Sequence, residues 1–406
     1  MDIPSFVALT VALLLGLGIP KAFSLLYLGL VGTAFWMHRH PGSGASRLLI
    51  WSMGWLMLFG VSYAAFQVGW AVWNPPRSYV SEILAVTVLP AAGLWVGWLL
   101  NRRGQSFCTA LIFAYVIGAL VYSLASLALS RTPWWNVAET FLHVVRVPWG
   151  HPEFLSTRAV EQRAFLSLVL FPIGLTLACS RIKIRRYLGA AMLAMAFLAA
   201  HVSWALQGRI GLAALALSLL PMLWLLRTQT IRWSVLLMSG FAMTLAVRSG
   251  RLCDERVWLV GGFLARLSQA PWGGRLIKYS YADCDPQALN QFGSFPGSSA
   301  FTPHNLILDV YNDAGWIPAL CLLFAVIPIC FFLLTSFWKA FSFSGWTWPL
   351  ALRWSFISVL VVEWLAQPFL YTDQLMFSIG FIVAGILLAE FNAMSMGRPV
   401  ATQETC

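Results

Sequence analysis

The sequence predicts an all-α, polytopic membrane protein with about twelve transmembrane helices. Of its 406 residues, 59% are hydrophobic and only 10% are charged, whereas about a quarter of the residues of a soluble protein are charged. Apolar runs of membrane-spanning length recur along the whole chain, and short gaps rich in Arg and Lys separate them in a regular alternation. We therefore interpret residues 1–406 as a single integral membrane domain with two extended outer loops, the later one partly helical.

The apolar runs follow one another from the amino terminus to residue 394. A helix that crosses a bilayer needs roughly 17 to 25 predominantly apolar residues. The first run carries no basic start and no small-residue cleavage site, so we interpret it as a retained helix and not as a signal peptide. The predicted spans cover residues 3–19, 22–38, 48–73, 83–100, 108–129, 164–180, 187–207, 210–226, 233–250, 316–337, 355–372 and 377–394.

The gap after every second span is short and basic and contains no acidic residue. Because positively charged loops stay on the cytoplasmic side, we expect these gaps and both termini in the cytoplasm. The net charge of +11 comes from these clusters and not from one basic face, so no nucleic-acid partner is predicted. The basic residues of these gaps are Arg39, Arg47, Arg102, Arg103, Arg181, Lys183, Arg185, Arg186, Arg227, Arg232, Lys339 and Arg353.

Two of the remaining gaps are long and cover residues 130–163 and 251–315. Both are therefore periplasmic loops, and any catalysis is expected there. In the first loop, apolar residues recur at helical spacing, which predicts a helix that either lies in the membrane interface or packs on the bundle. In the second loop, residues 257–267 indicate a helix, and the Gly/Ser/Pro-rich residues 293–299 indicate a mobile loop that could gate a substrate.

The stretch 302–315 carries polar side chains among otherwise continuous apolar runs. We expect a short helix here, with Thr302 as its N-cap, Pro303 at its first position and Gly315 at its end. His304 would then lie at the positive end of the helix, which suits proton transfer beside a phosphate or an oxyanion. A surface helix that His304 merely caps is the alternative, and only the outer location of the stretch argues against it.

Cationic side chains are unusually numerous on the outer side. A tight turn at 207–209 joins two spans and puts Arg209 at the edge of the lipid, where it either serves a functional site or reaches the lipid headgroups. The second outer loop adds Arg251, Arg256 and Arg275. Such a surface beside a His indicates a polyanionic, diphosphate-bearing ligand, with ion pairs to neighbouring acids as the alternative for most of these residues.

The sequence contains none of the residue spacings that are typical of a metal site. No acidic pair is spaced to chelate a cation around a diphosphate, and the seven Cys include no CxxC pair and no Cys/His metal spacing. Neither a metal nor a cofactor is therefore predicted. Cys253 and Cys284 are the two Cys of the second outer loop, and we expect either a disulfide between them or two buried thiols.

At these residues the chain resembles the superfamily of bacterial O-antigen ligases and O-antigen polymerases, which are membrane glycosyltransferases with a large periplasmic loop late in the chain. The most specific feature is the motif at 303–305, Pro-His-Asn, with Gly315 ten residues after the Asn and directly before a span. Arg209 matches the family's Arg between two spans, although the family more often shows Ser-Arg-Gly there. Arg256 and the Pro-Trp-Gly-Gly at 271–274 are similar to a third family motif, which ends in Gly-x-Gly.

The resemblance implies transfer of a glycan from an undecaprenyl-diphosphate carrier to a hydroxyl acceptor on the periplasmic face, with inversion at the anomeric carbon. It implies that Arg209 and Arg256 grip the diphosphate and stabilise it as it leaves, while His304 orients or deprotonates the acceptor. The residues expected to bind substrate beside them are Asn305, Arg251 and Arg275.

Two kinds of alternative remain open. Within the superfamily, a ligase transfers the glycan to lipid A–core saccharide, a polymerase to another carrier-linked repeat, and a third variant to protein hydroxyls. We favour the ligase because the outer loop is moderate in size and the Pro-His-Asn motif is well formed. A transporter of an anionic solute is the alternative from another class; Glu363, Gln367 and Asp373 favour it, and the lack of repeated halves argues against it.

Overall fold

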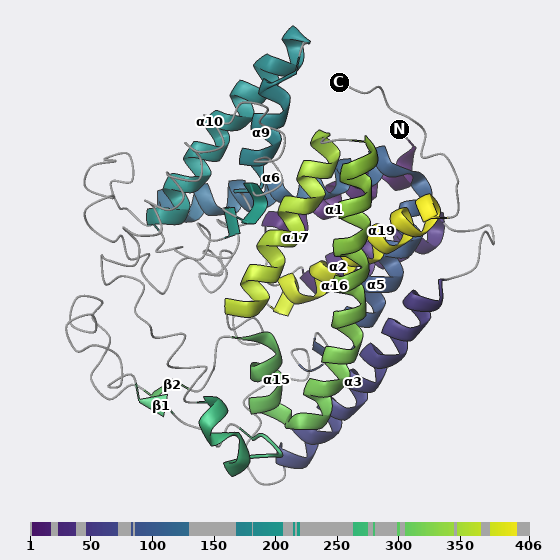
Figure 1. Cartoon of the computed structure of the whole chain (residues 1–406), viewed down its shortest axis with the longest axis vertical. Coiled ribbons are helices and arrows are strands. Elements are labelled where there is room, and N and C mark those ends of the chain that lie inside the picture. The colour runs from purple at the N-terminus through teal and green to yellow at the C-terminus, as the bar shows by residue number, and fades with distance from the viewer. Residues whose placement is uncertain are drawn as a thin grey trace.

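The computed structural model is all-helical apart from one short pair of strands (Figure 1). It describes residues 2–17, 23–37, 46–71, 83, 86–129, 168–180, 182–205, 214–215, 217–219, 263–274, 279–280, 299–300, 305–344, 347–366 and 374–395. These are called the described residues below.

The described helices follow the chain in the order in which the spans were predicted. In the amino-terminal half they are α1 (Ile3–Leu17), α2 (Phe23–Met37), α3 (Arg47–Ala71), α5 (Leu89–Leu100), the 3₁₀ turn η2 (Asn101–Arg103), α6 (Gln105–Leu129), α9 (Leu170–Ala178) and α10 (Lys183–Ala205). In the carboxy-terminal half they are η4 (Leu267–Gln269), α15 (Leu306–Ala314), α16 (Trp316–Ser344), α17 (Trp348–Ala366) and α19 (Gln374–Ser395). The strands β1 (Tyr279–Ser280) and β2 (Ser299–Ala300) pair antiparallel.

The predicted class, an all-helical membrane protein, is confirmed. Three described helices are long and apolar enough to cross a bilayer, within Arg47–Gln67, Gln105–Ala125 and Trp316–Ala340. Other described helices are apolar but shorter. The predicted span at 233–250 and the first outer loop at 130–163 lie outside the described residues.

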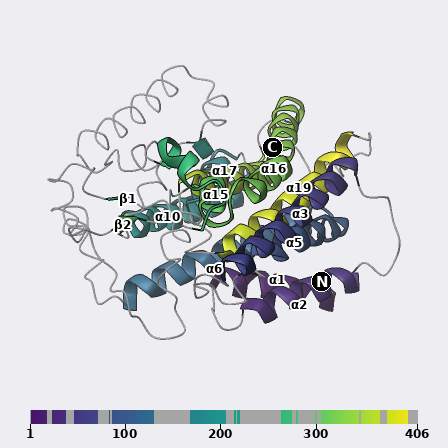
Figure 2. The same cartoon turned by 90° about the horizontal axis from the view of Figure 1, so that it is seen from below.

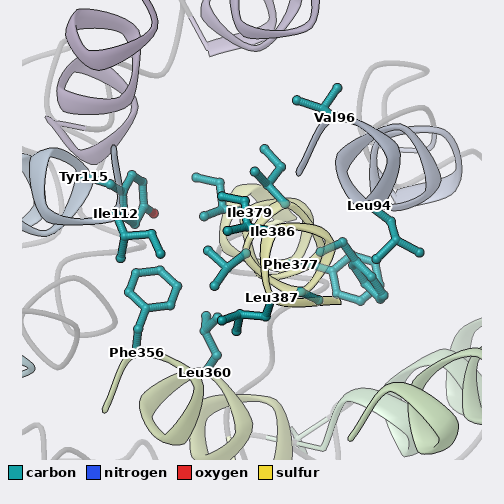
Figure 3. Packing of buried hydrophobic residues seen from close by; sticks show 14 of the residues in the cluster. Leu94, Val96, Ile112, Tyr115, Phe356, Leu360, Phe377, Ile379, Ile386 and Leu387 are labelled. Atoms are coloured by element: carbon teal, nitrogen blue, oxygen red, sulfur yellow. The ribbon is translucent and has the colours of Figure 1, made fainter. Parts of the chain in front are cut away.

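Helix α19 lies at the centre of the described bundle, with α5, α6 and α17 around it (Figure 3). Its closest partner is α5, since a Cβ added at Gly97 would lie 1.9 Å from the carbonyl oxygen of Ile382. Gly16 and Gly118 allow a similarly close approach of α1 and α6. Lipid tails are as apolar as Leu, so helices in a bilayer associate through close packing of this kind. These glycines are therefore central to the packing of the bundle.

Several polar residues meet at one end of the bundle. Asp2, just before α1, forms an ion pair with Arg103 in the turn after α5. At the same turn Gln105, the first residue of α6, donates a 2.7 Å hydrogen bond to Glu390 near the end of α19. The start of α1, the start of α6 and the end of α19 therefore lie on the same side of the bundle.

Arg353 corrects one part of the sequence interpretation. The sequence assigns it to a basic gap, but it lies inside α17 and its side chain is buried. Its guanidinium pairs with Glu390, with 2.9 Å between Nε and Oε2, and donates to the Thr109 hydroxyl at 2.9 Å and to the Gln105 carbonyl at 3.3 Å. A basic side chain at the edge of an apolar run can be buried when a carboxylate from another helix reaches it, and the sequence does not reveal such a partner.

Replacing Glu390 by Leu is expected to destabilise the protein by about 3–5 kcal/mol, because the Arg353 guanidinium would stay buried without its carboxylate. The double variant Glu390→Leu/Arg353→Met removes both charges and is expected to recover most of this loss. Thermal unfolding of the purified protein in detergent micelles measures both.

Arg103→Met is the control, since it breaks an ion pair whose side chains are 35% and 43% exposed. Such a pair contributes at most about 1 kcal/mol. Equal losses of stability in the single Glu390 variant and the double variant would contradict the role given to the buried pair.

Candidate functional site

Helix α15 begins after Asn305 and not after Thr302. Asn305 has an extended backbone, and its side-chain oxygen accepts hydrogen bonds from the N–H groups of Ile307 and Leu308 at 3.2 and 3.3 Å. It is therefore the N-cap, a position for which Asn is at least as well suited as Thr. The predicted cap at Thr302 is wrong, and His304 directly precedes the true cap instead of standing in the first helical turn.

The end of α15 docks on a turn formed by Pro271, Trp272, Gly273 and Gly274, which we call the glycine turn. The N–H of Gly274 donates to the carbonyl oxygen of Asp313 at 3.1 Å, and the N–H of Trp316 donates to that of Pro271 at 3.3 Å. Two of the segments that carry the family resemblance, separated by some forty positions in the sequence, are therefore in direct contact.

Gly273 and Gly315 lie against each other in this contact. A Cβ added at Gly273 would come within 2.5 Å of the Gly315 nitrogen, and a Cβ at Gly315 would come within 2.8 Å of the Pro271 carbonyl oxygen. Both glycines also have positive φ angles, 76° and 83°. Glycine is needed here for its backbone conformation and for its lack of a side chain. Gly315 ends α15, which confirms the prediction for that residue.

A second contact fixes the segment before the glycine turn. Residues 263–266 are helical and η4 follows, which confirms the described part of the helix predicted over 257–267. The hydroxyl of Tyr311 donates to the carbonyl oxygen of Leu267 at 3.0 Å, and its ring meets Phe263 edge-on at 5.8 Å. Burial raises the pKa of Tyr311, so its hydroxyl stays protonated and remains a donor.

Helix α3 holds α15 from the other side. The Tyr63 hydroxyl donates to the carboxylate of Asp313 at 3.0 Å, and the Gln67 side chain donates to its backbone carbonyl at 3.4 Å. The same carbonyl accepts the hydrogen bond from Gly274. Asp313 thus joins α3, α15 and the glycine turn at a single residue.

One face of α15 is polar and buried. Asp309, Asn312 and Asp313 are 0%, 1% and 2% exposed, and their spacing of three and four residues places them on the same side of the helix. Both Asp belong to the second outer loop predicted from the sequence, where charged residues are normally exposed, but both are buried. Their helical spacing in an otherwise apolar helix was the signal that could have identified them. Buried carboxylates require polar partners, so this face binds α15 firmly to its neighbours.

The start of α15 is tied to the end of α17. The side-chain amide of Asn305 donates to the carbonyl oxygen of Leu365 at 3.3 Å. Seen from below, α15 lies beside α16 and α17 (Figure 2). Figure 1 shows this assembly at the opposite end of the bundle from the start of α1. The polar contacts around Arg103 and Glu390 and those around α15 therefore lie at different ends of the bundle.

Aromatic side chains border the glycine turn. Trp272 is half exposed, stacks on Phe66 at a ring separation of 6.0 Å and also meets Trp316 at 6.3 Å. A Trp such as Trp272 can stack on a sugar or anchor the chain at the membrane interface. Its exposed half leaves both roles open to it.

Asn305 is the one predicted site residue that lies among the described residues. Its carbonyl-type oxygen caps α15 and its amide binds Leu365, so both ends of its side chain serve the fold. Among the described residues no group of His, Cys, Asp and Glu could hold a metal ion. The predicted site residues and cysteines outside the described residues are His304, Arg209, Arg256, Arg251, Arg275, Cys253 and Cys284.

Replacing Gly315 by Ala is expected to open the contact between α15 and the glycine turn. Gly104→Ala is the matched control, because Gly104 has nearly the same backbone angles, φ 95° and ψ 166° against 83° and −173°. A Cβ at Gly104 meets nothing within 4 Å. Both variants therefore carry a backbone strain of about 1–3 kcal/mol, but only Gly315→Ala forces the glycine turn away.

Hydrogen exchange distinguishes the two variants. The amides of Gly274 and Trp316 should exchange faster in Gly315→Ala and at the wild-type rate in Gly104→Ala, since only the first breaks their hydrogen bonds. Unchanged exchange of these two amides in Gly315→Ala would show that the close approach is not needed for the contact.

Comparison of the chain with protein-family models and with curated proteins finds no match. Membership of the glycosyltransferase superfamily therefore stays a prediction from the motifs.

Proposed function

We propose that the protein is a membrane glycosyltransferase of the O-antigen ligase type, which moves a glycan from an undecaprenyl-diphosphate carrier to a hydroxyl acceptor. The observation that carries this proposal is the docking of the glycine turn on α15. It brings the segment that follows Arg256 next to the segment that follows His304, although nothing in the local sequence requires the two to meet. A contact of this kind supports a reaction that uses Arg256 and His304 together.

The topology we propose has about twelve spans, with both termini in the cytoplasm and the site facing the periplasm of an inner membrane. The arrangement of the described ends supports it. Arg103 lies in a basic gap, and Asp2 and Glu390 lie near the two termini, all of which are expected in the cytoplasm. Contacts between Asp2 and Arg103 and between Gln105 and Glu390 hold these parts of the chain together. At the opposite end of the bundle, Tyr63 of α3 contacts α15, and Asn305 contacts the last turn of α17.

The chemistry we propose is a single displacement. The acceptor hydroxyl oxygen forms a bond to the anomeric carbon, and the bond from that carbon to the diphosphate oxygen breaks. His304 takes the hydroxyl proton, while the electron pair leaves with the undecaprenyl diphosphate. Arg209 and Arg256 neutralise the leaving diphosphate, a task for which the planar guanidinium is well suited. The anomeric configuration is inverted, and no metal is required.

Asn305 has a positioning role in this proposal. Its side chain fixes the start of α15 and binds the Leu365 carbonyl, which holds the backbone next to His304. Such preorganisation by the residues around a reactive group is what keeps the group in a productive geometry. Arg251 and Arg275 are proposed to contact the substrate. The proposed acceptor is lipid A–core saccharide, with another carrier-linked repeat as the acceptor of a polymerase.

The proposed topology predicts the location of reporter fusions. Fusions at Gly104 and Gln229 should report the cytoplasm, because both lie in short basic gaps. Fusions at Gly150 and Gly297 should report the periplasm. A cytoplasmic report at either of these two positions would place the motif on the wrong side of the membrane for a carrier-linked glycan.

The proposed reaction predicts that His304→Ala, Arg209→Ala and Arg256→Ala each reduce glycan transfer by about 10²- to 10⁴-fold in a protein that is still inserted and expressed. Arg209→Lys and Arg256→Lys keep the charge but lose the bidentate geometry, so they should stay badly impaired. Arg103→Lys in the exposed pair with Asp2 is the control and should transfer normally. Glycan transfer in cells, measured on deletion strains complemented with each variant, gives the result.

The outcomes separate the roles. Near-normal transfer by His304→Ala would overturn the assignment of the base. Full activity of both Lys variants would mean that the two Arg only anchor the chain at the membrane. Unattached long polymer on its carrier after deletion would indicate a ligase, whereas single repeats would indicate a polymerase.

A further inference from the structure

The hairpin of α9 and α10 carries the densest group of basic residues in the sequence. Four of the six residues from 181 to 186 are basic, and three of them, Lys183, Arg185 and Arg186, form the first turn of α10 with Ile184. We call these three residues the basic turn. Lys183 and Arg186 are exposed, and Arg185 is partly buried. No Asp or Glu occurs from residue 162 to residue 253, so no neighbour along the chain neutralises them.

Two basic residues elsewhere on the predicted inner side are paired with acids. Arg103 forms an ion pair with Asp2, and the buried Arg353 forms one with Glu390. A basic gap needs only its positive charge to stay in the cytoplasm. The topology therefore does not require that so many cations gather at a single exposed turn, and this concentration of charge favours an anionic ligand.

Close packing holds the basic turn in place. A Cβ added at Gly189 of α10 would come within 2.3 Å of the backbone nitrogen of Ala178, at the end of α9. Between the two helices, the hydroxyl of Ser180 accepts a hydrogen bond from the N–H of Ile182 at 3.3 Å. The start of α10 is thus fixed beside the end of α9, which defines the backbone positions from which the cations project.

Exposed apolar side chains adjoin the basic turn. Ile184 and Tyr187 are 74% and 75% exposed, and Leu188 is 48% exposed. Ile184 and Leu188 are neighbours on the helix surface, and Tyr187 lies one turn after Lys183. Tyr is enriched where acyl chains meet headgroups, and Lys and Arg reach from there to the headgroups. The start of α10 therefore has contacts for both the charged and the apolar part of a phospholipid.

The hairpin stands apart from the candidate site. Figure 1 shows α9 and α10 at the end of the bundle opposite to α15. The gap between the two helices is one of the short basic gaps, which the proposed topology puts in the cytoplasm. A group of four or more Lys and Arg next to a membrane span on that side attracts anionic lipid headgroups.

We propose that the basic turn binds an anionic glycerophospholipid of the inner leaflet, such as phosphatidylglycerol. The cations of the basic turn bind the phosphate oxygens, and Ile184, Tyr187 and Leu188 contact the first part of the acyl chains. Phosphatidylcholine has the same phosphate, but its own ammonium group cancels the charge, so the site should discriminate against it. The inference does not depend on glycan transfer, and it uses the proposed topology only to choose the leaflet.

Photo-crosslinking of the full-length protein in lipid nanodiscs tests the proposal. The probe is phosphatidylglycerol with a diazirine near the carboxyl end of one acyl chain, present as a minor component in phosphatidylcholine, and mass spectrometry locates the labelled residues. Labels are expected on the first two turns of α10. Each cation beside an anionic headgroup contributes about fivefold in affinity. The three cations should therefore favour the probe over phosphatidylcholine with the same diazirine by about 100-fold.

Salt tests whether this preference is electrostatic. In 1 M salt the Debye length falls to about 3 Å, so the two lipids should label α10 almost equally. A preference for phosphatidylglycerol that persists unchanged in 1 M salt would overturn the assignment to the exposed cations.

Two double variants that each remove two cations locate the site. Lys183→Gln/Arg186→Gln should lower the preference for phosphatidylglycerol about 25-fold, at about fivefold per charge. Arg102→Gln/Arg103→Gln is the matched control in η2, where Asp2 already pairs with Arg103, and it should leave the labelling of α10 unchanged. Equal labelling of α10 by the two lipids at low salt, or an equal loss in both double variants, would overturn the proposal.

Nanodiscs offer the same lipids on both faces, so the labelling pattern tests the site without assuming the topology. Neither result depends on whether the protein transfers a glycan. The leaflet is tested separately: a reporter fusion at Gln229 that reports the periplasm would overturn the assignment to the inner leaflet.

Discussion

The backbone at Gly273 passes so close to Gly315 that neither position has room for a side chain. This approach determines how the glycine turn packs against the end of α15. It allows two backbone hydrogen bonds between the glycine turn and the end of α15, and these bonds fix the direction in which α16 enters the apolar layer. The hydrogen bonds of α15 with α3 and α17 hold the same helix from other sides.

Buried polar groups occur at both ends of the described bundle, and they have the same physical consequence. At one end Arg353 and Glu390 join α6, α17 and α19. At the other, Asp313 joins α3, α15 and the glycine turn. A buried charge or carboxylate tolerates few arrangements of its neighbours, so such groups select one packing out of the many that apolar helices would accept. The ends of the helices, where a site would stand, are therefore better defined than apolar contacts alone would make them.

The sequence was most informative where the signal was local or averaged over many residues. Composition predicted the all-helical membrane class, and Gly315 marked the end of α15 because a left-handed residue has to be glycine. Sequence analysis failed where the structure depends on a contact with a residue far away in the chain. Thr302 and Asn305 are both good caps, and the contact of Asn305 with the distant Leu365 is one that the sequence does not reveal. No residue near Arg353 in the sequence indicates that Glu390 is its partner, and none near Asp313 indicates that Tyr63 is its partner. The motif residues suggested a shared site, but the contact between residues 271–274 and the end of α15 joins segments that are far apart in the sequence.

The central claim is that the contact between the glycine turn and α15 supports glycan transfer from a lipid diphosphate. The most direct measurement is transfer by the purified protein in lipid nanodiscs, with a defined undecaprenyl-diphosphate glycan, a lipid A–core acceptor and a metal chelator. The account predicts a glycosylated acceptor with inverted anomeric configuration, released undecaprenyl diphosphate in equal amount, and no loss of rate with the chelator. Loss of all transfer on chelation, or retention of configuration, would contradict the mechanism. Uptake of an anionic solute into vesicles with no transfer to any hydroxyl acceptor would contradict the function.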